Sequence, residues 1–249
     1  MPLTPPMSRM LWIGVGLSAQ VAFHLLVPAL IWFMHFGASA PAASTWGPAA
    51  DLAWDALLIL GFVVPHSILL MPPVRSWINR HAPPALWGSL FTWATTIALA
   101  AMILLWHPVA GAVWDLRGTA YGLMLGAAAA SWLALAYSMW LGGFGWQTGW
   151  TSFHAWWRGQ PIPRRDLCDR GAYAVFRHPI YASFVAISWA APTMDLGHLL
   201  LSVLMTAYCL LGSVAKDRRL LRFIGDPYRA YMARVPGWPA MPRGMLGRG

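Results

Sequence analysis

The sequence predicts an all-α, polytopic membrane helix bundle, and three observations lead to that fold class. Of the 249 residues, 58% are hydrophobic and only 10% are charged, with a mean hydropathy of +0.53. Soluble domains carry about 25% charged residues, so this composition is unsuited to a surface in water. The 17 Trp, 20 Pro and 23 Gly are typical of bilayer proteins, whose aromatic rings gather at the interfaces. The third observation is a series of long apolar runs, and we expect residues 1–249 to form a single transmembrane helical domain.

Six apolar runs approach the ~20 residues that cross a ~30 Å hydrocarbon layer. The fifth run is short and joins the sixth through residues 193–197. We therefore expect the last two runs to form a C-terminal helical hairpin that is tilted or does not fully cross the bilayer. The predicted spans are Met10–Phe36, Leu52–Met71, Leu86–Trp106, Thr119–Leu141, Ile180–Pro192 and Leu196–Ala215.

The positions of Lys and Arg predict the orientation of these spans, because short loops rich in them stay in the cytoplasm. Sixteen of the 17 Lys and Arg residues fall on alternate loops, and only Arg117 falls on the opposite side. We expect a multi-pass protein of the inner, cytoplasmic membrane with both termini in the cytoplasm. Residues 142–179 then form a cytoplasmic loop, and residues 216–249 form a cytoplasmic C-terminal segment.

The net charge of +9 predicts a basic surface that attracts anionic membrane lipid. A nucleic-acid partner is disfavoured, because the charges are distributed over loops that an apolar bundle separates. All eight acidic residues are Asp and none is Glu, so a mechanism that needs a glutamate base or countercharge must use another group.

Candidate chemistry concentrates in the second half of the chain. Arg177, His178 and Pro179 lie at the entrance of the fifth span, just before Tyr181, and proline is favoured in a first helical turn. Free backbone N–H groups and the positive end of a helix dipole add to the charge of Arg177 there, which predicts a site for a carboxylate or phosphate. The competing interpretation is that Arg177 and His178 anchor a helix at the lipid headgroups.

The segments around this site form a recognisable set. An Arg-His-Pro-x-Tyr segment at 177–181, a hydrophobic hairpin and a Gly-x-x-Tyr-x-x-Tyr segment at 225–231 resemble the membrane methyltransferases of the isoprenylcysteine carboxyl methyltransferase and phospholipid N-methyltransferase type. Within that group the chain most resembles the methanethiol S-methyltransferase and NnrU-like proteins. That likeness rests on His66-Ser67, on Phe144-Gly145-Trp146-Gln147, and on residues 189–199.

The resemblance implies an S-adenosylmethionine site on the cytoplasmic side and an acceptor, a small thiol or a lipophilic molecule, that enters from the bilayer. It assigns cofactor binding to Arg177, His178, Tyr181, Asp217, Tyr228 and Tyr231, and it implies no metal. His66 and Gln147 are candidates to orient the acceptor, and His178 is the third candidate catalytic residue. Methyl transfer mainly needs an aligned nucleophile in a dry pocket, so positioning residues suffice. For His66 and Gln147 the alternative is a satisfied polar group within the bundle.

One position departs from that family pattern. Members usually have two consecutive glutamates at the end of the sixth span, where this chain has Lys216-Asp217. Asp217 is expected to meet the cofactor's ammonium group, whereas Lys216 would repel it.

Two alternatives follow. The chain is either a non-catalytic subunit that packs against membrane-protein partners, or a haem-binding protein like the NnrU-related zeta-carotene isomerases. In the second case the haem ligands would come from His24, His35, His66, His178 and His198.

Overall fold

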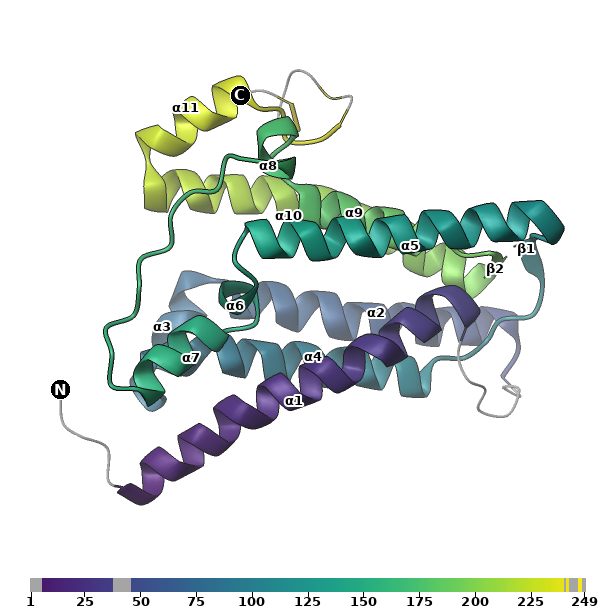
Figure 1. Cartoon of the computed structure of the whole chain (residues 1–249). Coiled ribbons are helices and arrows are strands. Elements are labelled where there is room, and N and C mark those ends of the chain that lie inside the picture. The colour runs from purple at the N-terminus through teal and green to yellow at the C-terminus, as the bar shows by residue number, and fades with distance from the viewer. Residues whose placement is uncertain (1–5, 38–45, 240, 242–245, 248–249) are drawn as a thin grey trace.

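The computed structural model describes residues 6–37, 46–239, 241 and 246–247 and contains an α-helical bundle (Figure 1). In lipid every backbone N–H and C=O must be satisfied within the protein, which helices achieve along their own length. Serine side chains inside these helices bond to carbonyl groups one turn earlier, as Ser131 does with Ala127. The long helices are α1 (Pro6–Phe36), α2 (Pro48–Leu69), α4 (Trp87–Leu105, preceded by the 3₁₀ turn η1, Pro84–Leu86), α5 (Gly118–Leu141) and α10 (Leu196–Ile224).

These five helices are long and apolar enough to cross a membrane, so the prediction of a polytopic all-α bundle is confirmed. The fifth predicted span is different. Helix α9 (Pro179–Trp189) has 11 residues, which at 1.5 Å per residue reach about 16 Å, half of a ~30 Å hydrocarbon layer. The chain continues towards the far end of the bundle as a short extended segment that contains β2 (Thr193–Asp195).

Helix α10 continues past the end of the predicted sixth span at Ala215. It ends at Gly225, whose φ of +76° is a conformation that glycine adopts readily and that stops a helix. Lys216 and Asp217 are therefore helical residues. The predicted C-terminal segment 216–249 begins inside α10 and includes α11 (Asp226–Arg234).

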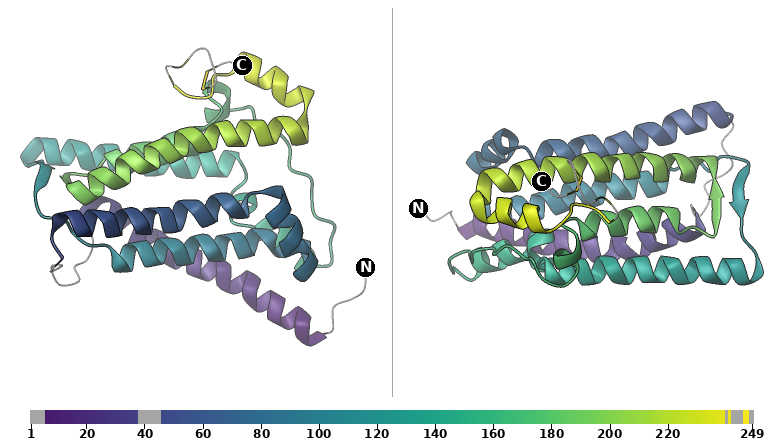
Figure 2. Two further views of the ribbon diagram at one scale, coloured as in Figure 1. Left: turned by 180° about the vertical axis from the view of Figure 1, so that it is seen from behind. Right: turned by 90° about the horizontal axis from the view of Figure 1, so that it is seen from above.

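The helices form two layers that enclose the core (Figures 1 and 2). Helices α1, α2 and α4 pack together in one layer, helices α5, α9 and α10 form the other, and α2 and α10 join the two layers. The buried side chains of Phe33, Ile59, Met102, Leu135 and Leu201 come from both layers and form one apolar cluster.

Short elements cover the two ends of the bundle. At one end β1 (Ala112–Asp115) pairs antiparallel with β2, with Trp114 opposite Met194. The opposite end carries the predicted loop 142–179 and the arginine-rich segments (Figure 1). That end contains α3 (Pro72–His81), α6 (Phe144–Gln147), α7 (Trp150–Trp157), α8 (Ala172–Val175) and α11.

Candidate functional site

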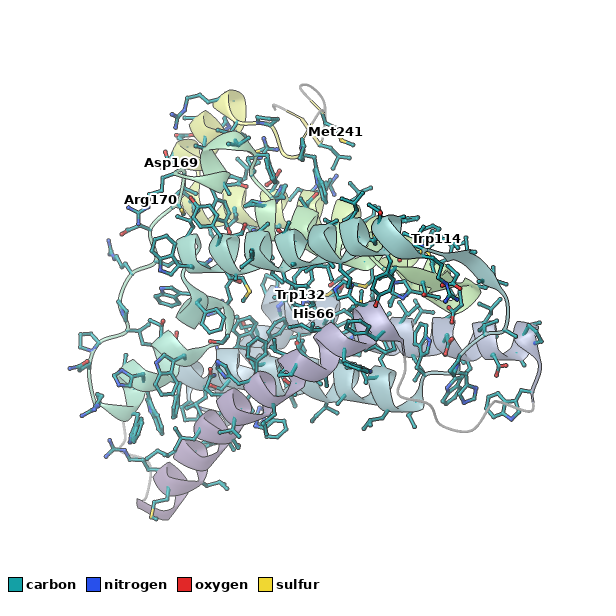
Figure 3. All side chains as sticks on the ribbon, turned by 45° about the vertical axis from the view of Figure 1, so that its right-hand side comes forward. His66, Trp114, Trp132, Asp169, Arg170 and Met241 are labelled. Carbon is teal, nitrogen blue, oxygen red and sulfur yellow. The ribbon has the colours of Figure 1, made fainter. Side chains whose placement is uncertain are left out.

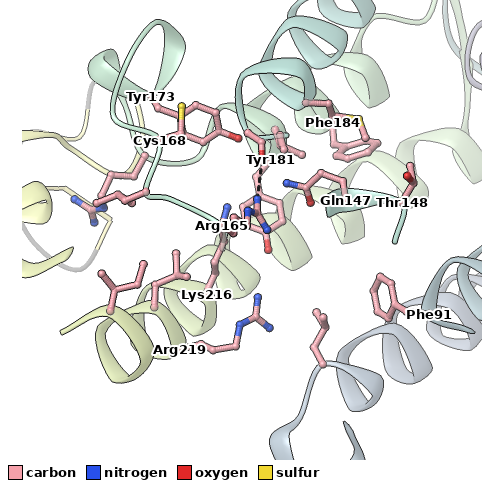
Figure 4. Close-up of a pocket in the computed structure, with 18 of the residues that line it drawn as sticks. Phe91, Gln147, Thr148, Arg165, Cys168, Tyr173, Tyr181, Phe184, Lys216 and Arg219 are labelled. Atoms are coloured by element: carbon pink, nitrogen blue, oxygen red, sulfur yellow. Dashed lines mark hydrogen bonds between the residues drawn. The ribbon is translucent and has the colours of Figure 1, made fainter. Parts of the chain in front are cut away.

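A cavity of about 480 Å³ lies between the two helix layers at the arginine-rich end (Figures 3 and 4). Its apolar wall comes from both layers and includes Phe23, Phe91, Met139, Ile180 and Phe184. Its polar wall comes from α6, α10, α11 and the loop before α8, and it includes Gln147, Arg165, Lys216, Arg219 and Tyr228. The cavity is thus amphipathic, with a size in the range of small-molecule sites.

Six of the eight site residues predicted from the sequence line this cavity. His66 comes from α2, Gln147 from α6 and Tyr181 from α9, so segments distant in the sequence meet here. The other three are Arg177, Tyr228 and Tyr231. His178 and Asp217 are buried behind the wall and are absent from the lining.

Asp217 is the centre of a buried polar cluster with Arg177, His178 and Tyr228. Arg177 Nη2 donates to Asp217 Oδ2 at 2.8 Å, and the Tyr228 hydroxyl donates to Oδ1. His178 Nε2 lies 3.0 Å from Oδ1 but lacks the alignment of a hydrogen bond. Burial and the adjacent carboxylate raise the pKa of Tyr228, so its hydroxyl stays a donor. The carboxylate of Asp217 therefore has its negative charge satisfied inside the protein.

Arg177 attaches the part of the C-terminal segment that follows α11 to the helix bundle. Its Nη1 donates to the carbonyl of Val235 at 2.5 Å and to that of Gly247 at 2.9 Å, and its backbone N–H donates to Pro236 at 2.8 Å. The side chain has no exposed surface. Its Nε is buried without a hydrogen-bond partner among the described residues. Most of the guanidinium thus holds the structure together, and Nε is the nitrogen that has no hydrogen-bond partner among the described residues.

The site has a roof made by α8 and α11. Tyr231 donates to the carbonyl of Tyr173 at 2.5 Å, and the Tyr173 hydroxyl donates to Ser138 at the end of α5 at 3.3 Å. Burial raises the pKa of Tyr173 to about 12. A Cβ at Gly142 would lie 2.7 Å from that hydroxyl, so a larger residue where α8 docks on α5 would displace the end of the Tyr173 side chain.

Three cations turn into the cavity, as Figure 4 shows for Arg165, Lys216 and Arg219. The Lys216 ammonium lies 5.4 Å from the centre of the Tyr181 ring, and Arg165 donates to the carbonyl of Gly142 at 2.9 Å. Burial lowers the pKa of Arg165, and the charge of Arg219 acts in the same direction. None of the three makes an ion pair with another described residue.

Sequence reasoning missed Arg165 and Arg219, and it expected Lys216 and Asp217 to act in opposite ways on the same cofactor ammonium group. Consecutive residues on an α-helix point about 100° apart, whereas residues three apart share a face. Lys216 and Arg219 therefore face the cavity together, and Asp217 faces the buried cluster. The three-residue spacing of Lys216 and Arg219 was the signal in the sequence that could have identified Arg219 as a cavity residue. The expectation that Asp217 meets a cofactor ammonium stays a prediction, which its three internal partners disfavour.

The histidines proposed as haem ligands bond to nearby groups of the bundle. His35 accepts from Trp132 at 2.7 Å and contacts the carbonyl of Ala190, and His66 lies 3.3 Å from the Thr95 hydroxyl. His24 and His198 each contact a backbone carbonyl. Within the described ranges no group of three or more His, Cys, Asp or Glu side chains that could hold a metal ion occurs.

Comparison with known proteins gives clear relatives. The chain is 30% identical over 188 residues to a methanethiol S-methyltransferase of Mycobacterium tuberculosis, covering 74% of this chain and 77% of that protein. The chain belongs to this membrane methyltransferase family. A methanethiol S-methyltransferase of Pseudomonas deceptionensis is 29% identical, covering 79% of this chain and 74% of that protein. Nurim of Rattus norvegicus is 28% identical, and 70% of each chain is covered.

No protein-family model and no solved structure matches the chain. The resemblance seen in the sequence motifs is thus confirmed by relatives that cover more than two thirds of the chain, and the membrane methyltransferase family is the assignment on which the following proposals rest.

Proposed function

We propose that the protein is an S-adenosylmethionine-dependent methyltransferase that acts on a small thiol or a lipid-soluble acceptor in the cavity between the helix layers. One observation carries this proposal: the motif residues of the family resemblance, drawn from α2, α6, α9 and α11, line a single cavity. The relatives named methanethiol S-methyltransferase support the reaction class.

The lining suits most of the cofactor. Its carboxylate matches Arg177, whose Nε has no hydrogen-bond partner among the described residues. Its sulfonium matches the aromatic rings of Tyr181 and Phe184, because a ring face attracts a cation, and its neutral base matches the same rings by stacking. Asp166 is the acid that the described lining offers to the ammonium group. The bound cofactor would supply an electrophilic methyl group.

The chain's own contribution would be positioning and dryness. Gln147 offers an amide donor and acceptor in the lining, and His66 offers an imidazole held by Thr95, so either side chain is placed to orient an acceptor. The apolar wall and the α8–α11 roof exclude water around the reacting atoms. Aligned reactants in a dry site account for much of the rate of a group transfer. His178 is buried behind the wall, where it supports Arg177 and Asp217.

The alternative is a non-catalytic protein that keeps the fold and contacts other membrane proteins. The specific observation in its favour is the charge at position 216. Lys216 faces the cavity, and Asp217, the remaining acid of the pair, has its oxygens engaged by Arg177 and Tyr228. A cofactor with a positive sulfonium and ammonium would therefore meet repulsion.

The orientation is proposed with the same function. The arginine-rich end of the bundle faces the cytoplasm of the cell's inner membrane, where the cofactor is made, and the β1–β2 end faces outward. Acceptors then reach the cavity either from the cytoplasm or through the apolar wall from the bilayer.

The test measures calorimetric binding of S-adenosylmethionine to purified protein in neutral detergent and transfer of a labelled methyl group to methanethiol and longer alkyl thiols. Gln147→Leu should lower kcat/KM about fivefold, since a hydrogen bond is worth about 1 kcal/mol. Gln160→Leu, at an exposed position outside the lining, is the matched control. Absence of cofactor binding and of transfer in the folded wild type would reject the enzyme in favour of the non-catalytic protein.

A further inference from the structure

The cavity carries positive charge that the protein itself does not neutralise. Its lining contains Arg165, Arg177, Lys216 and Arg219 but, of acids, only Asp166 among the described residues. Arg177 is balanced by Asp217. The other three cations make no ion pair within the described part of the chain. Like charges gathered at one half-enclosed site repel one another, and an anion that enters relieves this repulsion.

The same cavity is apolar on its other side. Phe91, Phe184 and Met139 belong to three long or apolar helices of the bundle and face the cavity beyond the cations. Lys216 is 20 residues after the start of α10 at Leu196, about 30 Å along the helix at 1.5 Å per residue. That distance equals the thickness of the hydrocarbon layer, so the cations lie at headgroup depth and the apolar wall lies deeper.

We propose that this cavity binds an amphiphile with an anionic head, a phosphate or a carboxylate, held by Lys216, Arg219 and Arg165, with its apolar part along the opposite wall. The amphiphile would be the methyl acceptor or its carrier. Its role as acceptor rests on the proposed function, whereas its binding does not.

Charge balance gives a second reason for an anionic partner. S-adenosylmethionine carries a carboxylate, an ammonium and a sulfonium, so it adds one net positive charge to a site that already has an excess of cations. An acceptor with an anionic head supplies the missing negative charge. A neutral acceptor leaves the excess uncompensated in a partly buried site, where charges interact several-fold more strongly than in water. The cavity therefore favours an anionic amphiphile over a neutral one of equal length.

The experiment compares binding of decyl phosphate, decanol and inorganic phosphate by calorimetry, at one concentration of neutral detergent. Decyl phosphate should bind at least tenfold more tightly than either decanol or inorganic phosphate. Lys216→Gln and Arg219→Gln should each weaken that binding about tenfold. The matched control is Arg222→Gln, which removes the same charge from an exposed position of α10 outside the cavity and should leave the affinity unchanged.

Several results would overturn the inference. Equal affinities for decanol and decyl phosphate would show that the cavity does not recognise an anionic head. Equal affinities for inorganic phosphate and decyl phosphate would show that it does not recognise an apolar chain. Equal loss in the Arg222→Gln protein would reassign the effect to general surface charge. Thermal melting of each variant shows whether it is folded, and Lys216→Glu gives an independent measurement: it should weaken decyl phosphate binding and tighten S-adenosylmethionine binding.

The two proposals fail in different ways. Charge-dependent binding of decyl phosphate without any methyl transfer would reject the enzyme and retain the binding site. Methyl transfer to a neutral thiol that decyl phosphate does not inhibit, and that Arg219→Gln does not alter, would retain the enzyme and reject the anionic amphiphile.

Discussion

Replacing Asp217 with Asn tests whether the buried ion pair with Arg177 holds the C-terminal segment on the bundle. The carboxylate accepts from Arg177 and Tyr228 and is only 5% exposed. Removing its charge leaves a guanidinium buried without a counterion, which costs about 3–5 kcal/mol. At 2–4 °C per kcal/mol for a chain of this size, the melting temperature should fall by roughly 6–20 °C.

The assay combines thermal melting in detergent with limited trypsin digestion. Because Arg177 also binds the carbonyls of Val235 and Gly247, its displacement should loosen residues 235–239 and 246–247 and speed cleavage after Arg234. Asp226→Asn is the control, since its pair with Arg229 is largely exposed, with Asp226 at 90%, and exposed pairs contribute little. If Asp217→Asn melts and is cleaved like Asp226→Asn, the buried cluster does not hold the segment.

Three further predictions address packing, ionisation and topology. Gly149→Ala should destabilise the protein far more than Gly159→Ala. Both glycines have positive φ, but only a methyl at 149 would lie 2.3 Å from the Gly88 carbonyl carbon. Equal melting temperatures of the two variants would contradict the close approach of α7 to α4. Burial raises the pKa of Tyr173 to about 12, so its contribution to stability is complete below the unfolded pKa of about 10 and is lost as the pH rises towards 12. The phenolate absorbance of folded wild type and Tyr173→Phe should rise equally between about pH 9 and 11, and a smaller rise in the variant would show that Tyr173 ionises normally. A reporter fused at Trp114 should report the outside of the membrane and one fused after Gly249 the cytoplasm; a cytoplasmic signal at Trp114 would reject the proposed orientation.

Much of the fold follows from local sequence. Four of the predicted spans agree closely with α1, α2, α4 and α5, because a long apolar run has few alternatives to a helix in lipid. The short fifth run became the 11-residue α9, as its length implied. The sixth run was predicted to stop where charged residues begin. Charge does not end a helix, however, and α10 continues to the glycine at 225.

Part of the candidate site was predictable from the sequence, but the directions of its side chains were not. The sequence motifs predicted that Arg177, Tyr181, Tyr228 and Tyr231 lie at one end of the bundle, and all four line the cavity there. The motifs did not indicate that most of the Arg177 guanidinium binds the C-terminal segment. These two hydrogen bonds join Arg177 to residues that are 58 and 70 positions later in the chain. No periodic pattern within one helix indicates a contact over such a separation.

The sequence by itself determined that the chain is a membrane helix bundle with its cations and its family motifs at one end, because composition and hydropathy act locally along the chain. Only the tertiary structure decided which of two adjacent charges enters the cavity. Lys216 and Asp217 differ by about 100° in direction, and the docking of α10 against α9 and α11 turned the lysine into the cavity and the aspartate towards Arg177. The direction of a side chain depends on how helices pack, and packing is a property of the whole chain.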